Sequence, residues 1–319
     1  MQDAALWTIQ PPYPPTARDN DDLIVTLFLA SFQDRSPHTL RNYRLGIQRF
    51  RSLLFPRRLK DATWLDIEHF KNYLLGRTSA SGPRLSPSSV AVQLAALRSL
   101  YRWASDPNIA LLPHNPTTAV RLPKPEVTSR NRYLTKQELA KLLSELFRQG
   151  PRNYLLGLML TLTGLRVSEL ISVRWEDFYE DIEGRGVWLH IRNGKGGKRR
   201  SVKIPEPLWK MIKKHRHDPD RRREDAGSLL FPISSRQVAR ILEAARKRCG
   251  FDKAVSAHWL RHTNATLALL GGASLQQVQE TLGHSQITTT QRYLHTVEQM
   301  KKAAPDYVAD NLRDLLASR

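Results

Sequence analysis

The spacing of apolar residues in the first third of the chain predicts amphipathic helices. Ser36 and Pro37 form a typical helix start, with serine as the cap and proline in the first turn. Apolar side chains then recur three or four positions apart on one stripe, at Leu40, Tyr43, Ile47, Phe50 and Leu54. Further helices are expected over residues 64–75 and 88–104. Because no strand pattern interrupts them, residues 21–122 are predicted to form a small helical domain.

The segments around this domain have a different composition. Residues 1–20 contain four prolines and are expected to form an extended tail. Residues 123–131 also show no apolar periodicity and are predicted to be a linker. A second domain is expected over residues 132–319. It begins with a helix that Thr135 and Glu138 cap reciprocally.

Helices and strands are both predicted in this second domain. The apolar run at 154–162 is typical of a buried helix. Strand character follows at 175–179, 187–191 and 201–204, and Asn-Gly and Gly-Gly pairs predict a hairpin turn between the last two. A short C-terminal amphipathic helix is expected, with its apolar face at Val308, Leu312, Leu315 and Leu316. The predicted fold is therefore mainly α with a small antiparallel β-sheet.

The charge balance points to a polyanionic partner. The 319 residues include 50 Lys and Arg against 30 Asp and Glu, a formal net charge of +20. No apolar run reaches the roughly 18 residues that span a bilayer, so we expect no membrane partner. Met1 is not followed by a secretion signal, and a cytoplasmic location is expected. Cys249 is the only cysteine, which excludes an intrachain disulfide and a cysteine-rich zinc module.

Five short motifs in the second domain contain groups suited to phosphate chemistry. They are Thr163-Gly164-Leu165-Arg166-Val167-Ser168-Glu169-Leu170, Gly194-Lys195-Gly196, His258-x-x-Arg261-His262-Thr263, Leu282-Gly283-His284 and Thr289-Thr290-x-x-Tyr293. Each is weak evidence alone. Glu169 could simply pair with Arg166, and a lysine in a glycine-rich turn is usually only solvated. The set, however, supplies a nucleophile, anion-binding arginine forks and an acid.

A tyrosine nucleophile needs such neighbours. A free tyrosine has a pKa of about 10, so ionising it at pH 7 costs about 4 kcal/mol. Nearby arginines and a base reduce this cost and stabilise the charge that develops on the phosphate oxygens. Lysine suits the acid role, because its pKa falls near other cations.

In this order and spacing, the motifs resemble those of the tyrosine site-specific recombinases, the family of phage integrases and Xer-type recombinases. The first domain resembles the family's helical, SAM-like core-binding domain. The resemblance implies that Tyr293 forms a 3′-phosphotyrosine link, Arg166 and Arg261 bind the scissile phosphate, and His284 adds a donor. It also implies that Lys195 protonates the 5′-oxygen and His258 acts as a base toward the tyrosine. Glu169 is expected to support these groups.

The resemblance also implies partners. The substrate would be double-stranded DNA with short inverted-repeat core sites, recombined through a Holliday junction. The chain would be a monomer when free in solution and would act as a homotetramer on DNA. Accessory proteins are further candidate partners. No metal and no ATP are expected, since the covalent link conserves the phosphodiester energy. With no room for an additional arm-binding domain before residue 21, a simple Xer-like or mobile-element recombinase in the nucleoid of a prokaryotic cell is favoured.

Two alternatives stay open. A type IB topoisomerase-like enzyme would use the same chemistry to relax supercoils. A non-catalytic sequence-specific DNA-binding protein would explain the charge but not the complete set of motifs. Supercoil relaxation at random sequence would favour the first alternative, and DNA binding without a covalent adduct would favour the second.

Basic side chains outside the motifs are candidates for DNA contacts. A basic stripe without acids follows the helix after Ser36, and further candidates lie on the helix at 88–104, in the hairpin turn and after Ser235. Each could equally be a solvated charge. The candidates are Arg41, Arg44, Arg51, Arg98, Lys198, Arg199, Arg236 and Arg240.

A metal site at the histidines is not expected. His258 and His262 are four residues apart, as in zinc-binding helices, but Trp259 stands where those motifs have glutamate. His262, His190 and His295 have no role in the resemblance, and we expect them to be structural.

Overall fold

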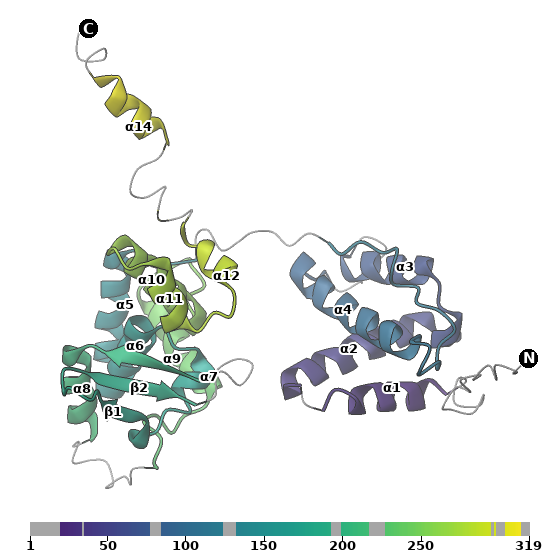
Figure 1. Cartoon of the computed structure of the whole chain (residues 1–319), viewed down its shortest axis with the longest axis horizontal. Helices are drawn as coiled ribbons and strands as arrows, with labels where there is room; N and C mark the ends of the chain where they lie inside the picture. The colour runs from purple at the N-terminus through teal and green to yellow at the C-terminus, as the bar shows by residue number, and fades with distance from the viewer. Residues whose placement is uncertain are drawn as a thin grey trace, which may run out of the picture. The chain divides into compact units, whose positions relative to one another are not determined.

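The computed structural model describes residues 20–33, 35–76, 84–123, 132–192, 199–216, 227–294, 297 and 304–313. The chain divides into two compact units, Met1–Val127 and Thr128–Arg319 (Figure 1). The described residues are mainly helical, with one small antiparallel sheet. The predicted fold class is therefore confirmed. The segments expected to be a tail and a linker lie almost wholly outside the described residues.

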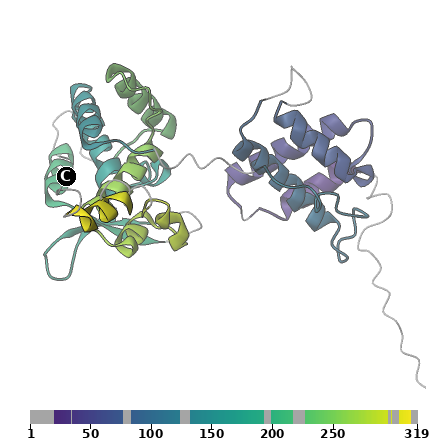
Figure 2. The same ribbon diagram turned by 90° about the horizontal axis from the view of Figure 1, so that it is seen from above.

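The N-terminal unit is built from four α-helices and one 3₁₀ turn, within the residues that the structure describes (Figures 1 and 2). Asn20 caps the first helix and Ser36 the second, each accepting from a backbone N–H three residues later. The elements are α1 (Asp21–Ala30), α2 (Pro37–Leu54), η2 (Leu59–Asp61), α3 (Trp64–Leu74) and α4 (Pro87–Ala104). The helices predicted at 64–75 and 88–104 are thus present to within one residue.

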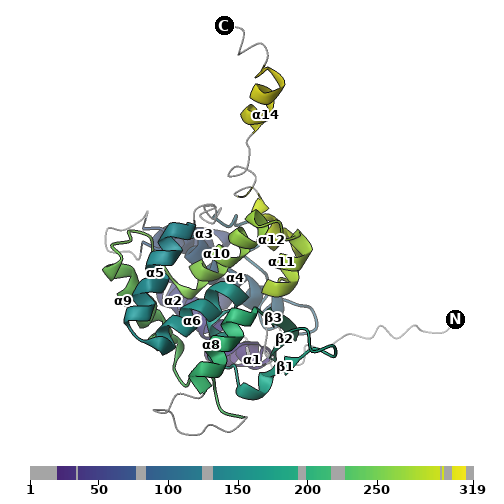
Figure 3. The same cartoon turned by 90° about the vertical axis from the view of Figure 1, so that its left-hand side faces the viewer.

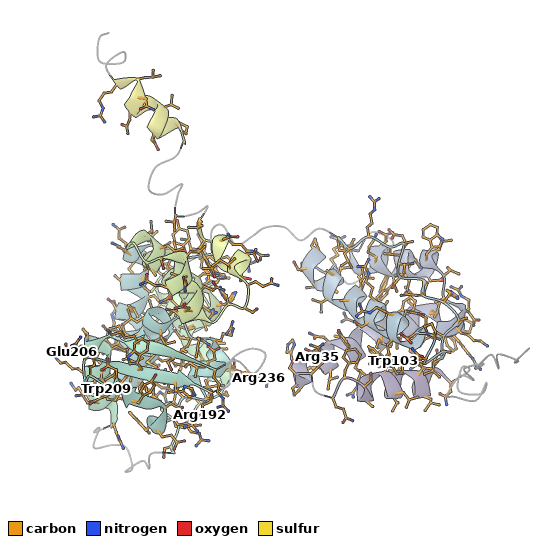
Figure 4. All side chains as sticks on the ribbon, viewed as in Figure 1. Arg35, Trp103, Arg192, Glu206, Trp209 and Arg236 are labelled. Carbon is orange, nitrogen blue, oxygen red and sulfur yellow. The ribbon has the colours of Figure 1, made fainter. Side chains whose placement is uncertain are left out.

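Aromatic and aliphatic side chains fill the core of this unit. The Phe50 ring lies edge-on to Phe70 and Tyr101, at 5.3 and 6.4 Å between ring centroids. Trp103, labelled in Figure 4, packs against Phe28 at 5.7 Å. Where α2 crosses α4, a Cβ on Gly46 would lie 3.1 Å from a backbone carbonyl, so glycine permits the close approach.

The C-terminal unit surrounds one central helix, α6 (Pro151–Thr163), which contacts α5, α8, α10 and β3 (Figure 3). This is the predicted buried helix, and Leu156, Met159 and Leu160 have no exposed surface. Thr135 and Glu138 form the predicted capping box of α5. The other helices are α5 (Lys136–Arg148), α7 (Val167–Leu170), α8 (Glu206–Arg216), α9 (Ser235–Arg248), α10 (Ala257–Leu270), α11 (Leu275–Leu282), α12 (Ile287–Gln291) and α14 (Ala304–Asn311).

The sheet has the order β1-β2-β3, with both pairs antiparallel. Its strands are β1 (Phe178–Glu180), β2 (Val187–Ile191) and β3 (Arg200–Ile204). The strand predicted at 175–179 is wrong in its first half, where Trp175–Asp177 forms a 3₁₀ turn, η4. There the Asp177 carboxylate accepts from the Arg174 backbone N–H at 2.7 Å, which fixes the turn.

The C-terminal helix α14 differs from the expectation. It begins at Ala304 with Pro305 in its first turn, and it ends at Asn311. Two residues of the predicted apolar face, Val308 on the helix and Leu312 just after it, are 56 % and 41 % exposed, whereas Leu315 and Leu316 lie outside the described residues. None of the helices in the described ranges is long and apolar enough to cross a membrane.

Candidate active site

Arg166 is positioned by the turn between α6 and α7. Gly164 ends α6 with a positive φ of 62°, and Arg166 is the N-cap of α7. Glu169 accepts both the Arg166 backbone N–H and its Nη1, each at 2.8 Å. The pairing anticipated between these two residues is therefore present. It fixes a guanidinium that keeps a quarter of its side-chain surface exposed.

Arg200 binds the same carboxylate from β3. Its Nη1 and Nη2 donate to the two carboxylate oxygens of Glu169 at 2.9 Å each, while Nε donates to the Thr281 carbonyl at 2.9 Å. Burial alone would raise the pKa of Glu169, but the hydrogen bonds and charges of Arg200 and Arg166 hold it at about 2. Glu169 is thus a buried carboxylate shared by two arginines. Arg200 was not among the residues predicted from the sequence.

Arg261 lies on α10 with only 2 % of its surface exposed. Its Nη1 donates to the Gly164 carbonyl at 2.6 Å and its Nη2 to the Leu282 carbonyl at 2.5 Å. Burial and the nearby charge of Arg166 lower its pKa to about 10. It therefore stays charged at neutral pH, and a guanidinium has five N–H donors, so these two bonds leave capacity for an anion.

His284 follows the left-handed Gly283 at the end of α11. Its Nδ1 lies 2.9 Å from the Thr290 hydroxyl. Burial, together with Arg261 and Arg166, lowers its pKa to about 4, so the ring is neutral near pH 7. A neutral ring that accepts from Thr290 at Nδ1 carries its proton on Nε2, where it can be donated to a ligand.

Tyr293 lies just after α12 with 8 % of its surface exposed. Its ring is parallel to His284, with centroids 6.4 Å apart. Burial raises its pKa, while the charges of Arg261 and Arg292 act in the opposite direction. Its hydroxyl oxygen lies 2.6 Å from Nδ1 of His262. The structural role expected for His262 thus stays a prediction, and the structure adds a contact between its ring and the Tyr293 hydroxyl.

The structure brings most of the predicted catalytic residues together. His258 lies one turn before His262 on α10, with ring centroids 4.3 Å apart, and burial, Arg261 and Arg166 lower its pKa. Charge interactions also join Arg261 to Arg166 and to Tyr293. Lys195 belongs to the segment 193–198, which lies outside the described residues.

The predicted DNA contacts fall into two groups. Arg41, Arg44, Arg199, Arg236 and Arg240 line the accessible side of their segments, and Figure 4 marks Arg236 near the start of α9. Arg51 and Arg98 instead have protein partners. Arg51 donates to Asp22 at 2.7 Å and lies 3.7 Å from Asp21, and Arg98 donates to the Val120 carbonyl. At Arg51 the stripe on α2 thus meets acids from α1, a contact that the pattern within one helix could not reveal. Lys198 is outside the described residues.

Both units of the chain are similar in sequence to domains of known proteins. Residues 132–300 match the model of the phage integrase family, and residues 26–107 match the phage integrase N-terminal SAM-like domain. The chain belongs to the phage integrase family. A tyrosine recombinase of Pseudothermotoga lettingae is 32 % identical over 281 residues, covering 86 % of this chain and 93 % of the relative. The tyrosine recombinase XerA of Pyrococcus furiosus is 31 % identical, covering 85 % and 88 %. This phage integrase family member is a tyrosine recombinase, an enzyme that breaks and rejoins DNA strands.

Solved structures with the same fold include DNA complexes. A lambda integrase tetramer bound to a Holliday junction superposes with a TM-score of 0.67 at 23 % identity, covering 89 % of this chain and 81 % of that chain. XerH bound to palindromic difH substrate gives a TM-score of 0.65 at 21 % identity, covering 88 % and 82 %. At these identities the likeness establishes the fold of this family member.

Proposed function

We propose that this tyrosine recombinase cleaves DNA by attack of the Tyr293 hydroxyl on a backbone phosphate, leaving a 3′-phosphotyrosine link. Arg166 and Arg261 bind the non-bridging oxygens, and His284 donates a further hydrogen bond. Lys195 protonates the departing 5′-oxygen. A second attack by a 5′-hydroxyl on the phosphotyrosine then rejoins the strand and releases the enzyme.

One observation carries this assignment. Arg166, Arg261, His284 and Tyr293 come from segments that are well separated in sequence, and they interact electrostatically in one buried region. Each arginine is fixed by bonds that leave donors unused, and preorganised donors stabilise developing charge without reorganisation. One carboxylate, Glu169, accepts from Arg166 and Arg200, while Arg261 donates to backbone carbonyls. The cluster therefore keeps a net positive charge, which favours a phosphate as the ligand.

The position of Lys195 in the chain supports its role as the acid. It belongs to the connection between β2 and β3, which pair along their whole lengths from Val187–Ile204 to Ile191–Arg200. Arg200 anchors the end of this hairpin to Glu169, the same carboxylate that fixes Arg166. The hairpin is therefore tied to the proposed phosphate site.

We further propose that the substrate is duplex DNA with short inverted-repeat core sites, and that four chains assemble on two sites and pass through a Holliday junction. The structural relatives on a Holliday junction and on a palindromic substrate support this assembly. Neither metal nor ATP is required, because the phosphotyrosine keeps the energy of the broken phosphodiester. We place the enzyme in the cytoplasm, on the nucleoid, with accessory proteins as additional partners.

The C-terminal helix is the proposed connector between subunits. Val308 on α14 and Leu312 just after it expose apolar surface that a neighbouring chain could cover. A chain truncated after Met300 should then cleave DNA but fail to assemble or to complete recombination. Normal assembly and recombination by the truncated chain would contradict this role.

Covalent capture from a random-sequence duplex library tests the function directly. Protein and DNA are incubated, denatured in SDS, and the DNA that stays attached to protein is sequenced. We expect an enriched pair of inverted half-sites. Adducts spread over unrelated sequences, together with supercoil relaxation, would favour a topoisomerase-like enzyme. Binding without adducts would favour a non-catalytic DNA-binding protein.

A further inference from the structure

We propose that His262 is the catalytic base that removes the proton from the Tyr293 hydroxyl, the role that the family resemblance implies for His258. This inference rests on the proposed function of Tyr293 as the nucleophile. It adds to the active site a residue to which the sequence assigned no chemistry.

The geometry singles out His262. Its Nδ1 lies 2.6 Å from Tyr293 Oη, a distance typical of a strong hydrogen bond with a phenol. Among the hydrogen bonds of the described residues, this is the one that involves the Tyr293 hydroxyl. His258 approaches the His262 ring instead, with centroids 4.3 Å apart and planes inclined by 74°.

The surroundings of His262 keep its ring neutral. Burial is the largest cause that lowers the pKa of His262, which is about 4. Charge interactions with His258, Arg132, Arg261 and His284 lower it further. His258 and Arg261 share its helix, whereas Arg132 precedes α5 and His284 follows α11. For the phenol to donate to Nδ1, the single ring proton must be on Nε2. The ring is then a base ready to accept, at any pH above about 5.

The proton that Tyr293 loses in cleavage returns to it in rejoining. As Tyr293 Oη forms its bond to phosphorus, its proton moves to His262 Nδ1 and the ring becomes an imidazolium. The bond between phosphorus and the 5′-oxygen breaks, and that oxygen receives a proton from Lys195. During rejoining, His262 gives its proton back to the departing tyrosine oxygen. Because a base with a low pKa cannot deprotonate a buried phenol completely beforehand, the transfer accompanies attack.

Three variants at the two histidines separate this role from that of His258. Single-turnover cleavage is measured on a nicked suicide duplex carrying the captured core site, with wild type, His262→Ala, His262→Asn and His258→Asn. His262→Asn keeps an acceptor near the position of Nδ1 but cannot take a proton, and it guards against misfolding of the alanine variant. DNA binding and thermal unfolding of each variant are measured alongside.

Loss of a general base should slow cleavage by about 10²–10⁴-fold. Wild-type cleavage should vary little between about pH 6 and 9, because His262 is already neutral there. In both His262 variants the cleavage rate should instead rise roughly tenfold per pH unit, because Tyr293 must then lose its proton to solvent. His258→Asn should cleave more slowly but keep the wild-type pH dependence. A purely structural role for His262 would lower the rate without producing this slope.

A second substrate separates the base from the acid. When sulfur replaces the 5′-oxygen that leaves, the leaving thiolate needs no proton, since a thiol has a pKa of about 8.5. Lys195→Ala should therefore be rescued by the sulfur substrate, whereas His262→Ala should not. Wild-type pH dependence in both His262 variants, or a steep slope in His258→Asn alone, would overturn the assignment to His262 and leave Tyr293 as nucleophile. An undiminished adduct with Tyr293→Phe, or none with wild type, would instead overturn the proposed function.

Discussion

Arg200 and Glu169 form a bidentate ion pair that joins strand β3 to the carboxylate that also binds Arg166. Both Nη atoms of Arg200 donate to the carboxylate at 2.9 Å, and the Glu169 side chain is 1 % exposed. The same carboxylate fixes Arg166. A residue without any proposed contact to DNA thereby couples β3, the start of α7 and, through the Thr281 carbonyl, the end of α11.

Replacing Arg200 by alanine should destabilise the protein and slow cleavage. Removing one partner of a buried ion pair typically costs about 3–5 kcal/mol, and we expect the lower end because Arg166 remains paired with Glu169. Urea unfolding and single-turnover cleavage measure the two effects. Arg199→Ala, at the exposed neighbouring position, should change the free energy of unfolding by less than about 0.5 kcal/mol. An equal loss in the free energy of unfolding for both variants would contradict a special role for Arg200.

Gly283→Ala should be more harmful than Gly250→Ala. Both glycines have left-handed φ values, 66° and 68°, so alanine costs about 1 kcal/mol at either position. At Gly283 the added Cβ would also lie 2.9 Å from Cδ of Arg200, whereas at Gly250 it would meet nothing within 4 Å. Only Gly283→Ala should therefore disturb the Glu169 pair and the adjacent His284. Thermal unfolding of both variants, with cleavage rates, checks this, and similar behaviour would contradict it.

The free energy of unfolding should fall as the pH is lowered from about 6.5 toward 4. The folded-state pKa values of His262 and His284 are depressed from 6.5 to about 4, so the unfolded chain binds more protons in this window. Their contribution is fully present above pH 6.5 and is lost on acidification. Urea unfolding at several pH values measures it. His284→Asn should flatten the dependence, and an unchanged slope would mean that His284 is not protected from protonation in the fold.

Arg41 and Arg51 should behave differently, although both lie on the basic stripe of α2. Arg41 is exposed, and Arg41→Ala should weaken DNA binding and reduce its salt dependence by about one counterion. Arg51 is bonded to Asp22, so Arg51→Ala should mainly affect stability. Binding titrations between 50 and 200 mM salt compare the two variants, a range over which 6–10 phosphate contacts would lose about 10³–10⁵ in affinity. A larger binding defect for Arg51→Ala would refute this distinction.

Local signals predicted most of the fold. Caps such as Ser36 and the Thr135–Glu138 box define helix starts through bonds within one turn, and these were correct. The strand prediction at 175–179 was partly wrong, because the Asp177 carboxylate accepts from the Arg174 backbone N–H and fixes a 3₁₀ turn there. An aromatic-rich pattern does not reveal such a bond. The placement of Val308 on α14 likewise depends on packing partners, which periodicity cannot identify.

The candidate site was predictable in its members but not in their contacts. The motifs named Arg166, Arg261, His284 and Tyr293, which the structure brings together. Arg200 was missed, although it shares the β3 face of the buried Val202 and Ile204, a sign of a buried cation. Similarly, His262 lies one helical turn after His258, so the two rings share one face of the helix. From the sequence this spacing was considered only as a possible zinc-binding motif. Its bond to Tyr293 spans 31 positions and could come only from the tertiary structure.

Covalent attachment of Tyr293 to DNA is the step on which the whole proposed reaction depends. Wild type and Tyr293→Phe are incubated with a nicked suicide duplex that carries the captured core site, and the products are separated in SDS. We expect a protein–DNA band for wild type alone, with the 3′-phosphate mapped to the peptide that contains Tyr293. The two proteins should bind the uncleaved duplex equally well. An equally strong band from Tyr293→Phe, or a phosphate attached to another residue, would show that Tyr293 is not the nucleophile.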